Sequence, residues 1–276
     1  MPISTLLITL VACGPKSNET TNVSTISEEQ KQVEQKQETY NVELDGLQVQ
    51  ARWDDGDTFS AYTTDGEAKK KIKARMNGYN TLESYGPVHS WGTWSAQELY
   101  VLAKESGIIA QKGTWNCSDL KTGGGYGRLL VDCPDLRSTL LREGYAHPFS
   151  VEKPAPQKDL DDLNYAIENK KGMWEKGAPA FLITSLHSQS EYPDKNDDGS
   201  YKKQAYNRIC DMKTGQCAVR EHNDIYEVCQ NVCIEDSCMI YVPYANRYKK
   251  EDLASCLAQP QDEDTSLEQS EEPTEK

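Results

Sequence analysis

Cysteine content constrains this chain more than any other feature of its sequence. Nine cysteines occur in 276 residues, and they are unevenly distributed. Cys13 lies alone near the N-terminus, whereas the other eight fall in two later groups. An even number of cysteines in an exported protein predicts disulfide bonds, which let a segment with few apolar residues fold. The eight candidates are Cys117, Cys133, Cys210, Cys217, Cys229, Cys233, Cys238 and Cys256.

An apolar run over residues 3–12 precedes Cys13. The run is far shorter than the ~20 residues that a membrane-spanning helix needs, so we expect no transmembrane helix. Its end, Leu10-Val11-Ala12-Cys13, resembles the lipobox of a bacterial lipoprotein signal. The resemblance implies that residues 1–12 are a cleaved signal peptide and that Cys13 carries a lipid. The protein would then be exported and anchored to the bacterial cell envelope, at the periplasmic side of the outer membrane or at the cell surface.

Composition divides the remaining chain into four parts. Residues 13–40 are polar and have too few large apolar side chains for a core, which predicts a flexible tether. Residues 259–276 hold seven acidic groups and one lysine, which predicts a disordered acidic tail. Between them we expect a folded domain over 41–176 and a cysteine-rich module over 177–258. The net charge of −14 disfavours nucleic-acid binding in general, but it is concentrated in the tail.

Residue patterns in the 41–176 region predict an α+β fold. Residues 71–76 have apolar side chains at every second position, with Lys73 and Arg75 on the opposite face. Strands that are separated from helices along the chain favour α+β, and five short strands bounded by turns suit a small closed barrel. We expect strands over residues 42–53, 58–62, 71–76, 108–115 and 128–131, and helices over 95–106, 136–143 and 159–171.

Two of the cysteines have a predictable partner. Cys117 and Cys133 flank a Gly-rich hairpin, so pairing of its strands would bring the two thiols together. The six cysteines of the 177–258 module allow fifteen pairings, and the sequence does not choose among them. A zinc site is the alternative for this module, although the paired CxxC motifs typical of such sites are absent. Its ligands would be His222, Cys229, Cys233 and Cys238.

Four charged residues of the 41–176 region have the chemistry that phosphodiester hydrolysis needs. Attack on phosphorus builds negative charge on oxygen, which the planar guanidinium groups of Arg75 and Arg128 can neutralise. Glu83 follows the strand that carries Arg75, and a carboxylate there can take a proton from water. Asp57, in a tight turn, offers oxygen to a hard cation that would orient the phosphate. Each residue alone is ordinary, and their order and spacing favour catalysis.

These residues belong to a longer series of motifs. The series is DGDT at 55–58, Arg75 and Glu83 eight residues apart, YGR at 126–128, and a helix that closes on 172–174. In this order the region from 49 to 174 resembles the staphylococcal nuclease (thermonuclease) family. The resemblance implies an OB-fold five-stranded barrel with three helices, dependence on Ca²⁺, and endonucleolytic cleavage of DNA and/or RNA. It assigns phosphate contacts to Arg75 and Arg128, the general base to Glu83, and a contact with the nucleotide to Tyr126.

The implied calcium site departs from the family in one ligand. Asn80 stands where the family has a second carboxylate, so it keeps a carbonyl oxygen and loses a negative charge. The loop after Glu83 is also shorter, and two nucleotide-lining tyrosines of the family fall on Ser150 and Glu152. The candidate metal ligands are therefore Asp57, Asn80 and Thr81.

Two other functions compete with a nuclease. Barrels of this kind can bind ligands after losing their catalytic residues, so one alternative is a surface lipoprotein that binds nucleic acid or protein without catalysis. The other is a structural lipoprotein that uses the cysteine-rich module for protein contacts. Retention of Arg75, Glu83 and Arg128 favours the enzyme, while residues 177–258 offer no function from sequence alone.

Overall fold

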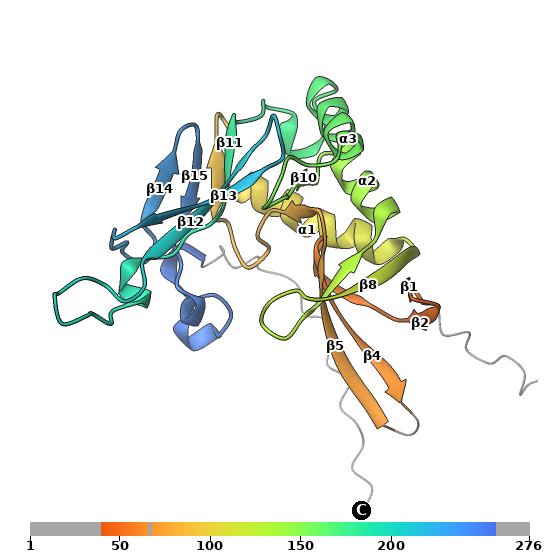
Figure 1. The fold of residues 1–276 in the computed structure, drawn as a ribbon. Helices are drawn as coiled ribbons and strands as arrows, with labels where there is room; N and C mark the ends of the chain where they lie inside the picture. The colour runs from red at the N-terminus through yellow and green to blue at the C-terminus, as the bar shows by residue number, and fades with distance from the viewer. Residues whose placement is uncertain (1–39, 66–67, 258–276) are drawn as a thin grey trace, which may run out of the picture. The chain divides into compact units, whose positions relative to one another are not determined.

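The computed structural model describes residues 40–65 and 68–257 (Figure 1). The predicted signal peptide, Cys13, almost all of the tether, and the acidic tail lie outside these residues. Within the two described ranges, no helix has the length and apolar character needed to cross a membrane. All described residues belong to one compact unit.

The first segment of the described chain mixes strands and helices, as an α+β fold requires. Helices α1, α2 and α3 lie near one another, and the β4–β5 hairpin extends away from them (Figure 1). The elements are β1 (Val42–Leu44), β2 (Leu47–Val49), β3 (Arg52–Asp55), β4 (Thr58–Asp65), β5 (Ala68–Met76), β6 (Tyr79–Thr81), β7 (His89–Trp91), α1 (Ala96–Lys112), β8 (Trp115–Gly123), β9 (Leu129–Asp132), α2 (Pro134–Arg142), β10 (Ala146–Pro148), α3 (Gln157–Glu168) and the 3-10 helix η2 (Gly172–Trp174).

The later segment consists of short strands and single 3-10 turns. Strands β11, β12 and β13 form one antiparallel sheet, and β14 and β15 form another together with β7. The elements are β11 (Phe181–Ser185), η3 (Gln189–Glu191), β12 (Ala205–Asp211), β13 (Cys217–His222), β14 (Asn231–Ile234), β15 (Ser237–Ile240), η4 (Tyr244–Asn246), η5 (Lys250–Asp252) and η6 (Ser255–Leu257).

The largest sheet is strongly curled. Its strand order is β2-β1-β8-β9-β5-β4-β3, so β2 and β3 are its two edges. Only two residues separate Val49, at the end of β2, from Arg52, at the start of β3, and such a link spans at most about 11 Å. A flat sheet would place edges six strand spacings, or about 29 Å, apart. The sheet therefore bends until its two edges approach each other.

This sheet has seven strands where the sequence predicts five. The segment expected to form a single strand over 42–53 breaks into β1, β2 and β3. The first break is the turn at Asp45 and Gly46, both with positive φ, at 50° and 84°. A turn of this type suits a two-residue hairpin, which returns the chain at once along β1.

The alternation predicted for β5 is confirmed. Ala74 and Met76 are buried in the core inside the curled sheet, whereas Lys73 is exposed and Arg75 is only partly covered. The same core receives Phe59 from β4 and Val131 from β9. The polar side chains on the outer face of β5 do not pack into this core, so they can contribute to a functional site.

Helix α1 is longer than the sequence indicates. It begins after Ser95, which forms a capping box with Glu98, and continues to Lys112. The strand expected over 108–115 is therefore wrong for all but its last residue. Gly107 lies in mid-helix because α1 crosses β3 there, and a Cβ at this position would lie only 3.2 Å from the Cα of Asp55. The glycine permits this close packing rather than ending the helix.

Helix α2 ends where the sequence predicts, and the end is tightly packed. Gly144 has a φ of 75°, the left-handed conformation that glycine adopts after a helix. A Cβ there would lie 2.2 Å from the carbonyl oxygen of Lys171, on the segment that follows α3. Gly172 faces it in turn, with a φ of 49°. The two glycines thus join the ends of α2 and α3.

All eight cysteines in the described chain form disulfides. Cys117 pairs with Cys133, as predicted from the Gly-rich hairpin. The zinc alternative is wrong, because the cysteines proposed as its ligands bond to other cysteines instead of facing a common centre. Several disulfides are typical of proteins in an oxidising or extracellular environment. The other pairs are Cys210–Cys217, Cys229–Cys256 and Cys233–Cys238.

The cysteine-rich segment packs into the first segment rather than around a core of its own. Leu182 and Cys210 share an apolar cluster with Leu99 of α1 and Leu163 of α3. Strand β7, from the first segment, pairs with β15. Residues on both sides of the expected boundary at 176 therefore contribute to the same core.

Candidate functional site

Asp57 lies in a turn that its neighbours hold in place. Tyr79 donates its hydroxyl to the carbonyl oxygen of Gly56 at 2.7 Å, and the Gly56 amide donates to Ser106 Oγ of α1 at 3.0 Å. The Asp57 side chain is buried at the end of this turn. Thr81, on β6, donates its backbone amide to Asp57 Oδ2 at 2.7 Å and its hydroxyl to the same oxygen at 3.1 Å.

Arg75 faces Asp57 because of strand register. Residues Thr58 and Arg75 are partners in the β4–β5 ladder, which places Arg75 beside the turn. Its Nη1 forms an ion pair with Asp57 Oδ1, which also accepts from the Thr58 hydroxyl at 2.9 Å. Burial by itself would raise the pKa of Asp57, but Arg75 and the donors around it hold that pKa below its usual value. Asp57 is therefore ionised at neutral pH.

Glu83 lies in the loop after β6 and is half-buried. Burial and the nearby charge of Asp57 raise the pKa of its carboxyl. Three guanidinium groups act in the opposite direction, those of Arg247, Arg75 and Arg128. Glu83 thus lies among opposing charges, and its pKa is closer to neutrality than that of an exposed glutamate, which suits a general base.

Arg128 is held by the backbone of the Gly-rich hairpin. Its Nε donates to the carbonyl oxygen of Gly125 at 3.2 Å and its Nη2 to that of Gly124 at 3.1 Å. The hairpin can pack here because residue 124 is a glycine. A Cβ at this position would lie only 3.2 Å from the Cβ of Arg75. Arg128 forms no ion pair within residues 40–65 and 68–257. Burial and the like charge of Arg75 lower its pKa, so an anion between the two arginines would relieve their repulsion.

The remaining sequence candidates lie at two different depths. Asn80 and Thr81 are both buried; Thr81 contacts Asp57 directly, whereas Asn80 donates its amide to the Thr81 carbonyl oxygen at 3.1 Å. Tyr126 is 92% exposed, at the tip of the hairpin. Its ring lies 5.7 Å from the Arg128 guanidinium, so it lies at the rim of the site.

Two further titratable residues join this site, and the sequence analysis missed both. Asp55 lies two residues before Asp57, and its pKa is raised well above the usual value by burial and by the charges of Asp57 and Glu83. The DGDT motif contains Asp55, so its presence could have been noticed. Arg247 comes from the cysteine-rich segment, 164 residues after Glu83, and no local pattern marks it.

The oxygen atoms around Asp57 fit a hard cation by type. Calcium binds carboxylate, amide and carbonyl oxygens, and Asp57, Asn80 and Thr81 carry these groups. The four contacts of Asp57 use all of the roughly four lone-pair sites of its carboxylate, so a cation must take the place of one. Within the described ranges, no three His, Cys, Asp or Glu side chains are grouped to hold a metal.

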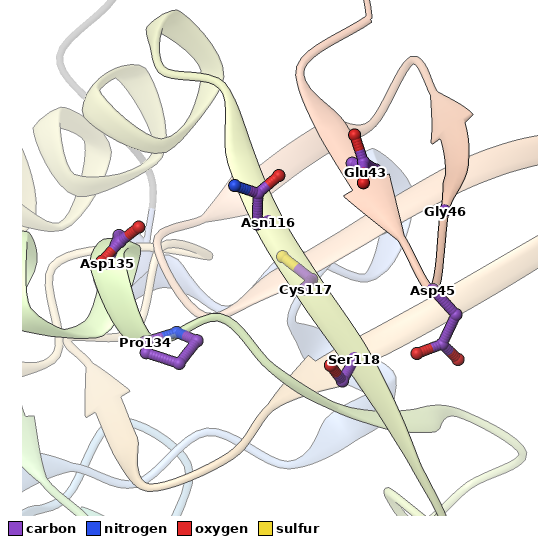
Figure 2. Close-up of a pocket in the computed structure, with 8 residues that line it drawn as sticks. All are labelled: Glu43, Asp45, Gly46, Asn116, Cys117, Ser118, Pro134 and Asp135. Carbon is purple, nitrogen blue, oxygen red and sulfur yellow. The ribbon is translucent and has the colours of Figure 1, made fainter.

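A pocket of about 440 Å³ lies elsewhere, beside the Cys117–Cys133 disulfide. Figure 2 shows that its carboxylates come from two parts of the chain: Glu43 and Asp45 lie on β1 and the turn after it, and Asp135 lies at the start of α2. Asp45 forms an ion pair with Lys121, with 2.9 Å between Asp45 Oδ2 and Lys121 Nζ. The pocket contains none of the residues that surround Asp57, so it is separate from the candidate site.

No model of a known protein family matches this chain, and no curated protein matches it by sequence. A functional assignment must therefore come from the chain's own residues and their arrangement.

Proposed function

We propose that this protein is a calcium-dependent phosphodiesterase that cleaves DNA and/or RNA internally. The observation that carries the proposal is the grouping of Asp57, Arg75, Glu83 and Arg128. These residues come from a turn, a strand, a loop and a hairpin, yet all four influence one another's charge. A structural role would not require two arginines and a half-buried glutamate around one anionic turn.

Each residue has a defined task in this proposal. Arg75 and Arg128 bind the phosphate from two sides and stabilise the charge that develops on its oxygens. Glu83 accepts a proton from the attacking water, and its raised pKa brings it closer to the working pH. Asp57, Asn80 and Thr81 hold the cation, which when bound supplies additional positive charge at the phosphate.

We further assign the curled sheet to the OB-fold. If the bent segment from β1 to β3 is counted as one strand, it lies beside β8 at one edge and beside β4 at the other. That arrangement supports a closed barrel of five strands, and it agrees with the resemblance of residues 49–174 to the staphylococcal nuclease family.

We also propose that the enzyme acts outside the cytoplasm, anchored by a lipid on Cys13. The four disulfides support an oxidising compartment. The calcium level outside cells is compatible with a weak site, because extracellular calcium modules work at dissociation constants of roughly 10⁻⁴–10⁻³ M.

The proposal is tested by incubating the purified protein with plasmid DNA and with RNA. We expect cleavage in millimolar Ca²⁺ and none after addition of a chelator. An Arg128→Lys variant should lose most activity, because an ammonium group cannot make the two-pronged contact of a guanidinium. Absence of cleavage by the unaltered protein on both substrates would overturn the proposed function.

A further inference from the structure

The loop that carries Glu83 packs against the C-terminal segment 243–257. At Gly86 the two segments touch so closely that a Cβ would lie 2.4 Å from Leu257 Cδ2. The segment is tied to the rest of the fold by the Cys229–Cys256 disulfide. It is also closed on itself, since the Ala254 amide donates to the Asn246 carbonyl oxygen at 3.1 Å. Its side chains are therefore held at a fixed place beside the candidate site.

Three tyrosines lie next to one another where these segments meet. The ring of Tyr248 lies 6.1 Å from that of Tyr85 and 5.8 Å from that of Tyr244, in edge-on arrangements. Tyr244 is 77% exposed and Tyr248 63% exposed, so parts of both rings are open to solvent. Tyr85 comes two residues after Glu83 and is half-buried. We call Tyr85, Tyr244 and Tyr248 the tyrosine shelf.

Positive charge accompanies the tyrosine shelf. The Arg247 guanidinium lies 4.8 Å from the centre of the Tyr85 ring, and its Nε donates to the Val242 carbonyl oxygen at 2.9 Å. In the part of the chain that the structure describes, Arg247 has no direct ion-pair partner. Lys249 and Lys250 follow and are exposed. Arg247, Lys249 and Lys250 thus place three positive charges within four residues, and the exposed Glu251 and Asp252 follow them.

We propose that the tyrosine shelf and Arg247 bind the nucleotides that flank the scissile phosphate in a single-stranded substrate. The inference deepens the proposed function and rests on it. Aromatic rings bind unpaired bases by stacking, and a nearby cation contacts the backbone between them. The tyrosine shelf lies next to Glu83, the proposed general base. This position favours nucleic acid, rather than a protein, as the molecule that binds there. The cysteine-rich segment then has a function, since it supplies a part of the substrate site.

The length of the substrate gives the first test. A 12-nucleotide single strand reaches the tyrosine shelf, whereas a p-nitrophenyl ester of a single nucleotide does not. We expect Tyr248→Ala to lower the ratio of kcat/KM for the 12-mer to kcat/KM for the short ester by about tenfold. Most of this change should come from a higher KM for the 12-mer. Stacking of one base changes affinity by roughly 5-fold to 150-fold. Arg247→Gln should act in the same direction, and a 12-bp duplex should respond less because its bases are already stacked.

Two matched variants control for loss of an exposed side chain. Tyr62 is 62% exposed on β4, and Arg220 is exposed on β13, so Tyr62→Ala and Arg220→Ala should keep the unaltered ratio between the two substrates. An unchanged ratio in both Tyr248→Ala and Arg247→Gln would overturn the inference while leaving the proposed function intact.

A binding measurement separates this inference from the proposed function. Fluorescence anisotropy would follow a labelled 12-nucleotide strand added to the Glu83→Gln protein, alone or combined with Tyr248→Ala. Weaker binding by the double variant supports the tyrosine shelf even if the unaltered protein cleaves neither substrate, a result that would overturn only the nuclease. Equal binding overturns the shelf and would mean that these tyrosines contact a protein partner or another copy of the chain.

Discussion

Glu83 differs from an ordinary loop carboxylate in what surrounds it. It has the anionic turn of Asp57 on one side and three arginines within electrostatic reach. A surface glutamate would have neither the burial that raises its pKa nor the cations that keep it available as a base. Its environment therefore favours the catalytic role that we propose for it.

Replacement of this residue tests its role. Glu83→Gln keeps the shape of the side chain but removes the proton acceptor, so we expect cleavage to slow by about 10²–10⁴-fold. The rate should be measured on plasmid DNA at saturating Ca²⁺, with the melting temperature recorded as a check on folding. Full activity in the folded variant would exclude Glu83 from the mechanism.

Asn80 gives a prediction about metal affinity. Hard cations bind more tightly as the ligands gain negative charge, so Asn80→Asp should lower the Ca²⁺ concentration for half-maximal cleavage, by about tenfold. Asp57→Asn should instead nearly abolish activity. Asn116→Asp is the control, because it adds the same charge on the exposed face of β8. A midpoint that is unchanged in Asn80→Asp would show that residue 80 does not contact the metal.

At the scale of elements, the sequence predicts β4, β5, β9, α2 and α3 better than it predicts the first strand or the C-terminal end of α1. Alternation identifies β5 because this strand has one face in the core and one outside it, while the turns on either side of β4 and the Gly-rich hairpin before β9 indicate those two strands. The course of α1 depends on a contact with β3, where Gly107 meets Asp55, and such a contact lies beyond any local pattern. The split of the first strand depends on Asp45 and Gly46, whose positive φ values a strand pattern does not reveal.

The junction between α2 and α3 gives a stability prediction. Gly144→Ala places a Cβ on a residue with left-handed backbone and against the Lys171 carbonyl. We therefore expect the free energy of unfolding to fall by about 3 kcal/mol or more. Gly46→Ala is the matched control, because Gly46 also has a positive φ but has open space around it. That variant should lose only about 1 kcal/mol. Urea unfolding of the three proteins measures both values, and equal losses would contradict the packing argument.

At the scale of the whole molecule, some residues of the candidate site can be predicted from the sequence and others cannot. Asp57, Arg75, Glu83 and Arg128 could be grouped in advance because their motifs stand in a recognisable order within one segment. The position of Arg247 could not, because it depends on how the cysteine-rich segment packs on the rest of the chain. The pairing of the last six cysteines likewise depends on tertiary structure.

Stability of the whole molecule should depend on pH through Glu191. Burial opposes its ionisation, but donors from His187, Tyr241 and the Ser188 backbone outweigh this and lower its pKa to about 2. Since the unfolded pKa is about 4.5, the stabilisation is complete above that pH and is lost as the pH falls towards 2. We expect Glu191 to contribute about 2 kcal/mol of this acid sensitivity.

Thermal melting at several pH values between 7 and 2.5 measures this contribution. Glu191→Gln should lower the melting temperature at pH 7 and should flatten its fall in acid. Glu227→Gln, on an exposed loop, is the control. Parallel melting curves for the unaltered protein and Glu191→Gln would contradict the assignment.

The disulfide pattern has a consequence for biogenesis. Among the described residues, the Cys229–Cys256 bridge encloses another bridge, Cys233–Cys238, and the remaining two bridges join cysteines that are consecutive in the chain. Because a chain is synthesised from its N-terminus, Cys229 and Cys233 are both present before Cys256 has been made. A Cys229–Cys233 bond formed at that stage is non-native, and it is resolved only by thiol–disulfide exchange, with Cys238 or with another thiol as the attacking group. Recombinant yield should therefore depend on a disulfide isomerase and not only on an oxidant, with the last-made segment of the protein maturing most slowly.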